Sequence, residues 1–528
     1  MKQSPSRARR SRSPGHAGSD RRRAERPVPA ARRLLVRLAQ WPWLLLLPIL
    51  AVAGWLRLTQ LDVWPLFVDE DAYTYMAIRL AELPFPESLG LYDEFRGPGY
   101  PKPSLALLLQ NALTPAAGDP VVAGRALSGL FGVVTTGLCY PLAHRLGGPA
   151  AGLLTAALYA VAPVAVLHER MVLQDGPMTA LALAAVLLGW RAVDWRSIPL
   201  GLAAGLAGLI AVQFKVPGIG VAGAIAGWLV AHYRHDRAGR LTPAILAAGG
   251  AILSYLLLIA SPLGRGLLDQ NRDLLQPVIH LWPNLQALAD SAWTYFPWAL
   301  LLLILAGGVL LWRADRRLAI GWLIALGVWI VPWLVLSRFA PSRYYLPAVP
   351  YALALAAFAL VWCWSWAGVY VPVARGAVAA GAVLLLWPSG QDAYRLITQH
   401  QSARLSTLDD WQYRSGWPSG YGYREAMALV RSVPPGSAVA FSVNPSRRIA
   451  IDFHRGLPPG VTNLGLIELG DPLPPNPNGP TFLVVDDGGD PEGSRLSQAT
   501  TAYPDLVVVG RFSRPELGSG ISVLHRAG

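Results

Sequence analysis

The chain has 528 residues, of which 53% are hydrophobic and only 15% are charged. A soluble globular protein carries about 25% charged residues, so this composition argues against that class. The net charge of +13 would suit a nucleic-acid-binding protein, but residues 1–37 alone hold 12 Lys and Arg against two acidic residues. That segment supplies +10 and leaves only +3 for the rest of the chain, and we therefore expect no nucleic-acid partner.

Residues 1–37 are rich in Ser, Pro, Gly and Arg and have no apolar periodicity, which predicts a disordered tail. Basic residues before a first membrane span favour the cytoplasmic side and attract anionic lipid. We expect this tail to hold the N-terminus in the cytoplasm. The two cysteines, Cys139 and Cys363, lie in apolar runs, so neither a disulfide framework nor a cysteine-based metal site is predicted.

Repeated apolar runs separated by short Arg-containing segments predict an all-α polytopic membrane protein with about 11 transmembrane helices. The expected spans, in chain order, are 41–58, 120–143, 148–167, 177–192, 198–213, 217–232, 242–261, 295–312, 318–336, 344–364 and 372–388. The apolar run 103–115 is bounded by prolines and is too short to cross a bilayer, so it predicts a helix lying in the interface.

An odd number of spans that starts in the cytoplasm places the C-terminus outside. The predicted inner loops agree, because they carry most of the loop arginines, among them Arg145, Arg234 and Arg317. We therefore expect a multi-pass protein of the plasma membrane. Its two large outer segments are predicted at 59–119 and 262–294.

Beyond residue 390 the composition becomes that of a soluble protein. Residues 424–433 are predicted to form an amphipathic helix, and strands are expected at 437–443, 481–485, 506–510 and 521–525. This pattern indicates a small α/β domain. The predicted organisation is a basic tail (1–37), a membrane domain (38–390) and an extracytoplasmic α/β domain (391–528).

Three consecutive carboxylates, Asp69, Glu70 and Asp71, follow the first predicted span by about ten residues. Charges crowded against hydrocarbon are costly, so ionisable residues at a membrane mark candidate functional sites. We interpret Asp71, and the later pair Asp93-Glu94, as solvated loop charges.

Only three of the 45 basic residues are lysines, and two of them, Lys102 and Lys215, fall on the predicted outer face beside prolines. A lysine is a compact point charge that suits contact with a phosphate. Alternatively, each lysine extends along the lipid to reach the interface. Other ionisable or tyrosine side chains expected at this face are Arg170, Asp175, Arg338, Arg343, Tyr344 and Tyr345. Such a face suits a substrate with its phosphate at the headgroup level and its tail in lipid.

The order of these features resembles the membrane-embedded glycosyltransferases of the GT-C class, which use polyprenyl-phosphate sugars. Within that class the chain is similar to the protein O-mannosyltransferase and lipid A aminoarabinose transferase branch, over roughly residues 40–390. The matching motifs are Asp69-Glu70 with Tyr73, Lys102-Pro103-Ser104-Leu105, Arg125-Ala126-Leu127-Ser128, Arg170 with Asp175, Lys215, and Arg343-Tyr344-Tyr345-Leu346-Pro347. The second motif departs from the family, because Ser104 replaces its second proline. Asp71 makes the register of the acidic motif ambiguous by one residue.

The resemblance implies a role for each matching residue. Asp69 would be the general base that deprotonates an acceptor hydroxyl, and Glu70 would help to position the acceptor or the base. The donor phosphate would be bound by Lys102, Lys215 and Arg343, with Tyr73 and Tyr345 lining its pocket. Asp175 and Arg170 would support this site. The family branch implies neither a metal nor another cofactor.

The expected function is therefore transfer of a sugar, with inversion, from a polyprenyl-phosphate donor to a hydroxyl of a lipid, glycan or protein acceptor on the extracytoplasmic face. One alternative is a membrane transporter or lipid flippase, for which charges near the bilayer midplane and an inverted repeat would be typical. The sequence instead places most of its charges at one face and contains no evident repeat. A non-catalytic scaffold is a second alternative, but it leaves the acidic triplet and the paired lysines unexplained.

Overall fold

The computed structural model describes residues 42–82, 104–233, 238–260, 279–370, 372–443, 457–487, 494–515 and 520–526. The predicted tail, Lys102 and the pair Asp93-Glu94 lie outside these residues.

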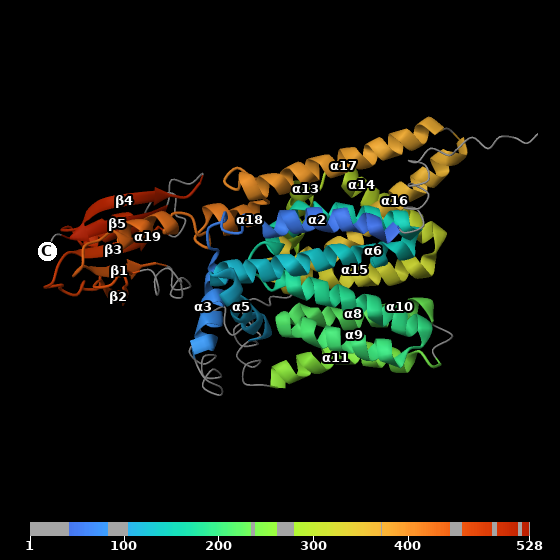
Figure 1. Cartoon of the computed structure of the whole chain (residues 1–528), viewed down its shortest axis with the longest axis horizontal. Coiled ribbons are helices and arrows are strands. Elements are labelled where there is room, and N and C mark those ends of the chain that lie inside the picture. The colour runs from blue at the N-terminus through green and yellow to red at the C-terminus, as the bar shows by residue number, and fades with distance from the viewer. Residues whose placement is uncertain are drawn as a thin grey trace, which may run out of the picture.

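Long helices form the body of the molecule, and the axes of most of them run roughly parallel in Figure 1; an exception is the pair Leu281–Tyr295 and Trp298–Ala314, between which the chain bends by 114°. In chain order they are α2 (Leu46–Leu58), α6 (Pro120–Ala160), α8 (Asp175–Trp195), α9 (Ile198–Phe214), α10 (Gly220–His232), α11 (Leu241–Ala260), α13 (Leu281–Tyr295), α14 (Trp298–Ala314), α15 (Arg316–Leu336), α16 (Val349–Tyr370) and α17 (Pro372–Thr398). Five helical segments in the described residues are long and apolar enough to cross a membrane, or six if the bent pair α13–α14 is one span. The predicted polytopic helical fold is thus confirmed, whereas the count of about 11 stays a prediction.

Local sequence signals set the ends of several of these helices. The Asp119 carboxylate accepts hydrogen bonds from the N–H groups of Val121 and Val122 (2.8 and 2.9 Å) and so caps α6. Asp315 caps α15 in the same way. An acidic side chain at this position satisfies amides that have no partner within the helix and complements the helix dipole.

Helix α6 covers the predicted span 120–143 and most of 148–167, and it consists of two helices that fold back on each other, because a Cβ atom added at Gly152 would lie only 2.7 Å from the carbonyl oxygen of Tyr140. The turn between the two helices lies at Gly147 and Gly148, whose backbone angles are not helical, and Gly148 has a φ of 70°, in the left-handed region that favours glycine. The second of these helices ends at Ala160, before the expected end of the predicted span 148–167, because Pro163 opens the short helix α7 (Pro163–Glu169).

Close packing of α9 against α11 depends on small residues. A Cβ atom added at Gly250 would lie 1.9 Å from the carbonyl oxygen of Gly205, and one added at Gly205 would lie 2.4 Å from that of Leu246. These distances leave no room for any side chain, so the two backbones touch directly. Small residues at such contacts are typical of helix pairs in membranes.

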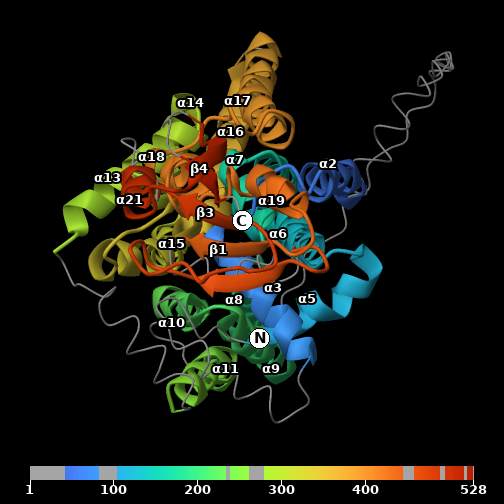
Figure 2. The ribbon, with the colours of Figure 1, turned by 90° about the vertical axis from the view of Figure 1, so that its left-hand side faces the viewer.

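Shorter elements gather at the end of the bundle that faces the sheet (Figure 1). Helix α3 (Val68–Glu82) runs across the bundle axes there, with α5 (Ser104–Ala117) beside it and α18 (Thr407–Asp410) close by. Figure 2 looks onto this end and places α3 across the ends of the long helices. Helix α5 corresponds to the predicted interface helix 103–115. The bundle thus presents one end covered by short elements, and the candidate site lies there.

The C-terminal part forms a five-stranded sheet with the order β2-β1-β3-β5-β4. Its strands are β1 (Ala438–Ser442), β2 (Thr462–Leu466), β3 (Thr481–Asp486), β4 (Val507–Ser513) and β5 (Gly520–Arg526). β1 pairs in parallel with both β2 and β3, whereas β5 pairs antiparallel with β3 and β4. Every residue of β1 and β3 is buried, as expected for the centre of a sheet.

Helices complete this α/β region. Buried residues of α19 (Tyr423–Arg431) pack against one set of strand side chains, and α21 (Ser494–Ala502) contributes Ala499 to a second cluster. The four predicted strands and the amphipathic helix all occur within a few residues of their expected positions, whereas β2 and α21 were not predicted. The boundary expected at residue 390 falls inside α17, which continues to Thr398.

Candidate active site

The acidic triplet forms the first turn of α3 rather than a loop. Carboxylates in the first turn of a helix are stabilised by the partial positive charge of its N-terminus. The expectation that Asp71 is a solvated loop charge is wrong, because its side chain is only 1% exposed. The reason is that α3 packs its buried residues, among them Ala72 and Tyr73, against the bundle and carries Asp71 inward. Asp69 differs, because 32% of its side chain is exposed.

Glu70 is fully buried and is held from three directions. Its two carboxylate oxygens accept hydrogen bonds from Nε and Nη2 of Arg125, both at 2.8 Å. The backbone N–H groups of Phe67 and Val172 also donate to it, at 3.1 and 2.7 Å. These four bonds engage both oxygens, so Glu70 fixes the start of α3 against α6 and is poorly suited to accept a proton. This contact supports positioning rather than chemistry.

Asp69 forms an ion pair with Arg343 over 2.9 Å. Arg343 lies in the 3₁₀ helix η4 (Ser342–Ala348) and is buried, with its guanidinium carbon 5.3 Å from the centre of the Phe67 ring. Within the described residues, Nε and Nη1 of Arg343 have no hydrogen-bond partner. A buried guanidinium with donors to spare is well suited to bind phosphate oxygens.

A second ion pair joins Lys215 to Asp175 over 2.6 Å. Lys215 follows the last residue of α9 and Asp175 is the first residue of α8, so the pair joins two helix ends. The ring of Tyr344 lies between the two cations, 4.7 Å from Nζ of Lys215 and 5.6 Å from the guanidinium carbon of Arg343. Lys215 therefore points into the protein, and the alternative of a lysine extended along lipid does not hold for it.

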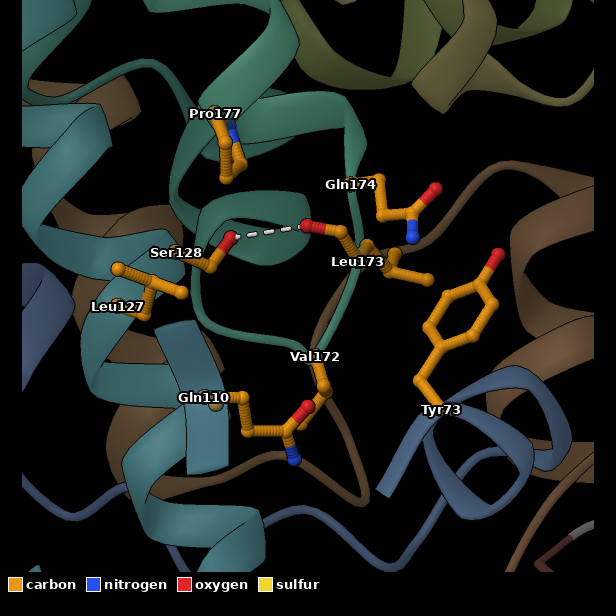
Figure 3. Close-up of a pocket in the computed structure, with 9 residues that line it drawn as sticks. Tyr73, Gln110, Leu127, Ser128, Val172, Leu173, Gln174 and Pro177 are labelled. Carbon is orange, nitrogen blue, oxygen red and sulfur yellow. Dashed lines mark hydrogen bonds between the residues drawn. The ribbon is translucent and has the colours of Figure 1, made fainter. Parts of the chain in front are cut away.

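Tyr73 and Tyr345 are both buried, and Tyr73 lies near Asp69 and Arg343. Tyr73 lines a cavity of about 20 Å³ with Gln110, Ser128 and Gln174. Figure 3 shows Tyr73 and Leu127 on opposite sides of this cavity, and the Ser128 hydroxyl donates to the Leu173 carbonyl oxygen. A space of this size holds about one water molecule and no sugar. Burial, followed by the nearby Asp69 charge, raises the pKa of Tyr73 well above its ordinary value, so its hydroxyl stays protonated.

Arg170 lies apart from the two ion pairs described above. Its guanidinium donates to the carbonyl oxygens of Leu56 and Gln60, at 2.6 and 2.7 Å, and thereby secures the end of α2. Arg170 and Asp175 thus have different roles, because only Asp175 takes part in the ion pairs described above. Tyr345 is 5% exposed, and its hydroxyl has no hydrogen-bond partner within the described residues.

Sequence reasoning did not identify a buried polar network next to Arg343. Nε2 of His168 lies 2.6 Å from Oγ of Ser342, and that hydroxyl donates to Oδ2 of Asp409 over 2.5 Å. The Tyr413 hydroxyl lies 3.3 Å from Nδ1 of His168. His168 follows directly after an apolar run and Asp409 lies far along the chain, so no local pattern connects them. The only available signal was an ionisable residue at the end of a predicted span.

Comparison with known proteins places this site in context. Residues 101–264 match the family model described as dolichyl-phosphate-mannose-protein mannosyltransferase. No curated protein matches the chain. A solved structure of ArnT from Cupriavidus metallidurans bound to undecaprenyl phosphate has 14% sequence identity and a TM-score of 0.56, and the match covers 91% of this chain and 97% of that one.

Two further structures are similar to the chain. The apo form of the same ArnT has 15% identity and a TM-score of 0.56, with 92% of this chain and 98% of that one covered. The arabinosyltransferase EmbB from Mycobacterium smegmatis has 13% identity and a TM-score of 0.38, with 74% of this chain and 40% of that one covered. The chain thus has the ArnT fold, and its resemblance to GT-C glycosyltransferases of the protein mannosyltransferase and aminoarabinose transferase type is confirmed.

Proposed function

We propose that the protein is a membrane glycosyltransferase that moves a sugar from a polyprenyl-phosphate donor to a hydroxyl group of an acceptor. The observation that carries this proposal is the pairing of Asp69 with Arg343 beside the Lys215–Asp175 pair. The two cations lie close to the Tyr344 ring, and the partly exposed Asp69 carboxylate is paired with one of them. A general base and a site for a phosphate leaving group are the two functions that this reaction needs.

In the proposed reaction Asp69 takes the proton of the acceptor hydroxyl while that oxygen attacks the anomeric carbon. The bond between this carbon and the phosphate oxygen breaks, and polyprenyl phosphate leaves with the electron pair. Arg343 and Lys215 stabilise the negative charge that develops on the leaving group, and Lys102 is expected to join them. A single displacement of this kind inverts the configuration at the anomeric carbon.

The position of the site supports a reaction at one membrane face. Helix α3 and the C-terminal sheet lie at the same end of the helical bundle (Figures 1 and 2). We assign this end to the extracytoplasmic side of the plasma membrane, because the basic tail is expected in the cytoplasm. The donor then lies in the bilayer with its phosphate at the headgroup level. The acceptor is a lipid, a glycan or a protein that reaches the site from outside.

The experiment that tests this function follows label from radiolabelled polyprenyl-phosphate sugars in membranes that contain the protein. Transfer of label to lipid, glycan or protein, with release of polyprenyl phosphate, is the expected result. Movement of intact labelled donor between leaflets without such release would instead support a flippase.

Replacing the proposed base gives the sharper test. Asp69→Asn removes the proton acceptor but keeps the size of the side chain, and we expect a loss of transfer of about 10²- to 10⁴-fold, as is usual for a general base. Asp62→Asn is the matched control, because Asp62 is an exposed carboxylate nearby in the chain. Undiminished transfer by Asp69→Asn would remove the base assignment.

A further inference from the structure

We infer that His168, Ser342 and Asp409 are positioning residues that aim Arg343 at the reaction centre. This inference rests on the proposed function, because it takes the donor phosphate as the ligand of Arg343. None of the three is predicted to touch substrate. They join three parts of the chain: α7, the start of η4, and the segment α18–η5 (Thr407–Ser415) that precedes the sheet.

The hydrogen bonds of this network define one arrangement of protons. The Ser342 hydroxyl gives its single proton to Oδ2 of Asp409. Oγ of Ser342 must then accept a proton from Nε2 of His168, over 2.6 Å. Nδ1 of His168 is thereby left as an acceptor for the Tyr413 hydroxyl. Burial lowers the pKa of His168 to about 4, so its ring is neutral near pH 7 and carries its one proton on Nε2.

Asp409 is also fixed from its own side. The Tyr295 hydroxyl donates to Oδ2 over 2.5 Å, and the Ser406 hydroxyl donates over 2.8 Å. Asp409 and His168 are both fully buried. The hydroxyls of Tyr295, Ser342 and Ser406 all donate to Oδ2 and hold Asp409 in one geometry, because a shift of the carboxylate would leave these buried hydroxyls unpaired, whereas Oδ1 has no hydrogen-bond partner among the described residues. The anchor of Ser342 is thus rigid.

Arg343 depends on this anchor for its direction. It directly follows Ser342 at the start of η4, where no side chain caps the first turn. Nη2 forms the ion pair with Asp69, whereas Nε and Nη1 have no hydrogen-bond partner in the described part of the chain, so the position of the backbone at Ser342 also determines where the guanidinium lies. Tyr413 adds a second constraint, because its ring packs against Phe67 at 4.7 Å and Phe67 lies beneath Arg343. One network therefore holds both the backbone and the ring that Arg343 contacts.

The charge of His168 matters for the same reason. Burial lowers the pKa of His168 to about 4, while the nearby Asp409 and Asp175 charges oppose this and those of Arg343 and Lys215 reinforce it. Protonated His168 would add a third positive charge to the cluster and would deprive Tyr413 of its acceptor. A neutral imidazole supplies the donor to Ser342 without competing for the donor phosphate.

The test uses two substitutions of His168 in the full-length protein. His168→Gln keeps an N–H donor close to the position of Nε2, whereas His168→Phe keeps a ring and removes both nitrogens. We expect His168→Phe to lower kcat by roughly tenfold or more with little change in the KM for the acceptor, because a small misplacement of a catalytic group has effects of this size. His168→Gln should restore most of the activity. Equal losses in the two variants would contradict the inference.

A double-mutant cycle with Arg343→Lys separates positioning from general structural damage. If His168 acts through Arg343, then His168→Phe costs little further activity in the Arg343→Lys background. Fully multiplicative losses would overturn the inference. If Arg343→Lys itself retains full transfer, then Arg343 does not bind the donor phosphate. That result would contradict the proposed function and is distinct from the result that would contradict the role of His168. Should His168→Phe not fold, Ser342→Ala removes the His168–Ser342 hydrogen bond, together with the bond to Asp409, by a smaller change and must then show the same dependence on Arg343.

Discussion

Replacement of Glu70 tests whether two adjacent carboxylates have different roles, with Glu70 structural and Asp69 catalytic. Glu70 and Asp69 are neighbours in α3, but Glu70 is fully buried and forms a double hydrogen bond with Arg125, which is itself only 1% exposed. Asp69 is partly open and faces Arg343. We therefore expect Glu70 substitutions to reduce stability and Asp69 substitutions to reduce turnover.

The size of the effect follows from the contacts. Glu70→Ala leaves Arg125 buried without its carboxylate, and breaking a buried ion pair in this way costs about 3 to 5 kcal/mol. It also removes the acceptor of two backbone N–H groups, at about 1 to 3 kcal/mol for each group left unsatisfied. Glu70→Gln keeps the shape and one carbonyl oxygen, so we expect it to cost less, on the order of 3 kcal/mol. Both values are large against a total stability of about 5 to 15 kcal/mol.

The assay combines thermal unfolding of the purified protein in detergent with the transfer rate per folded molecule at a permissive temperature. Glu70→Gln should lower the unfolding temperature while its folded fraction keeps most of its transfer activity. Asp69→Asn should show the reverse. A Glu70→Gln protein with normal stability and a loss of turnover as large as that of Asp69→Asn would refute this reasoning and return Glu70 to the chemical step.

Two further predictions concern acidity and packing. His168 has a pKa of about 4 in the folded protein and an ordinary value of 6.5, so the unfolded chain binds more protons between these two pH values. The free energy of unfolding should therefore fall by about 3 kcal/mol as the pH drops from 6.5 to 4. Unfolding temperatures measured over this range should show that His168→Gln lacks this part of the loss. Gly250→Ala should destabilise the protein by more than 1 kcal/mol, roughly the lower range for an overpacked contact, because the new methyl group would overlap the Gly205 carbonyl. Gly249→Ala, where a Cβ would meet open space, is its control, and equal unfolding temperatures for the two variants would contradict the packing argument.

Local sequence patterns were sufficient for most of the secondary structure of this chain, but not for β2 and α21. Long apolar runs and buried strands such as β1 and β3 are determined over short stretches, and these elements occur close to where they were expected. Strand β2 was not predicted because it is a short edge strand whose residues are partly or fully exposed, and because it contains Gly465 at a φ of 76°. An edge strand makes half of its contacts with solvent and so carries little apolar signal.

The sequence by itself also identified most of the charged residues of the candidate site, because ionisable groups at the ends of apolar runs are few and costly. It did not determine their partners. Only the tertiary structure pairs Asp69 with Arg343, engages Glu70 with Arg125, buries Asp71 and joins His168 to Asp409. Such pairings depend on how distant helix ends meet in space, and no local periodicity records that distance. The acidic triplet therefore acquires three different environments from one short stretch of sequence.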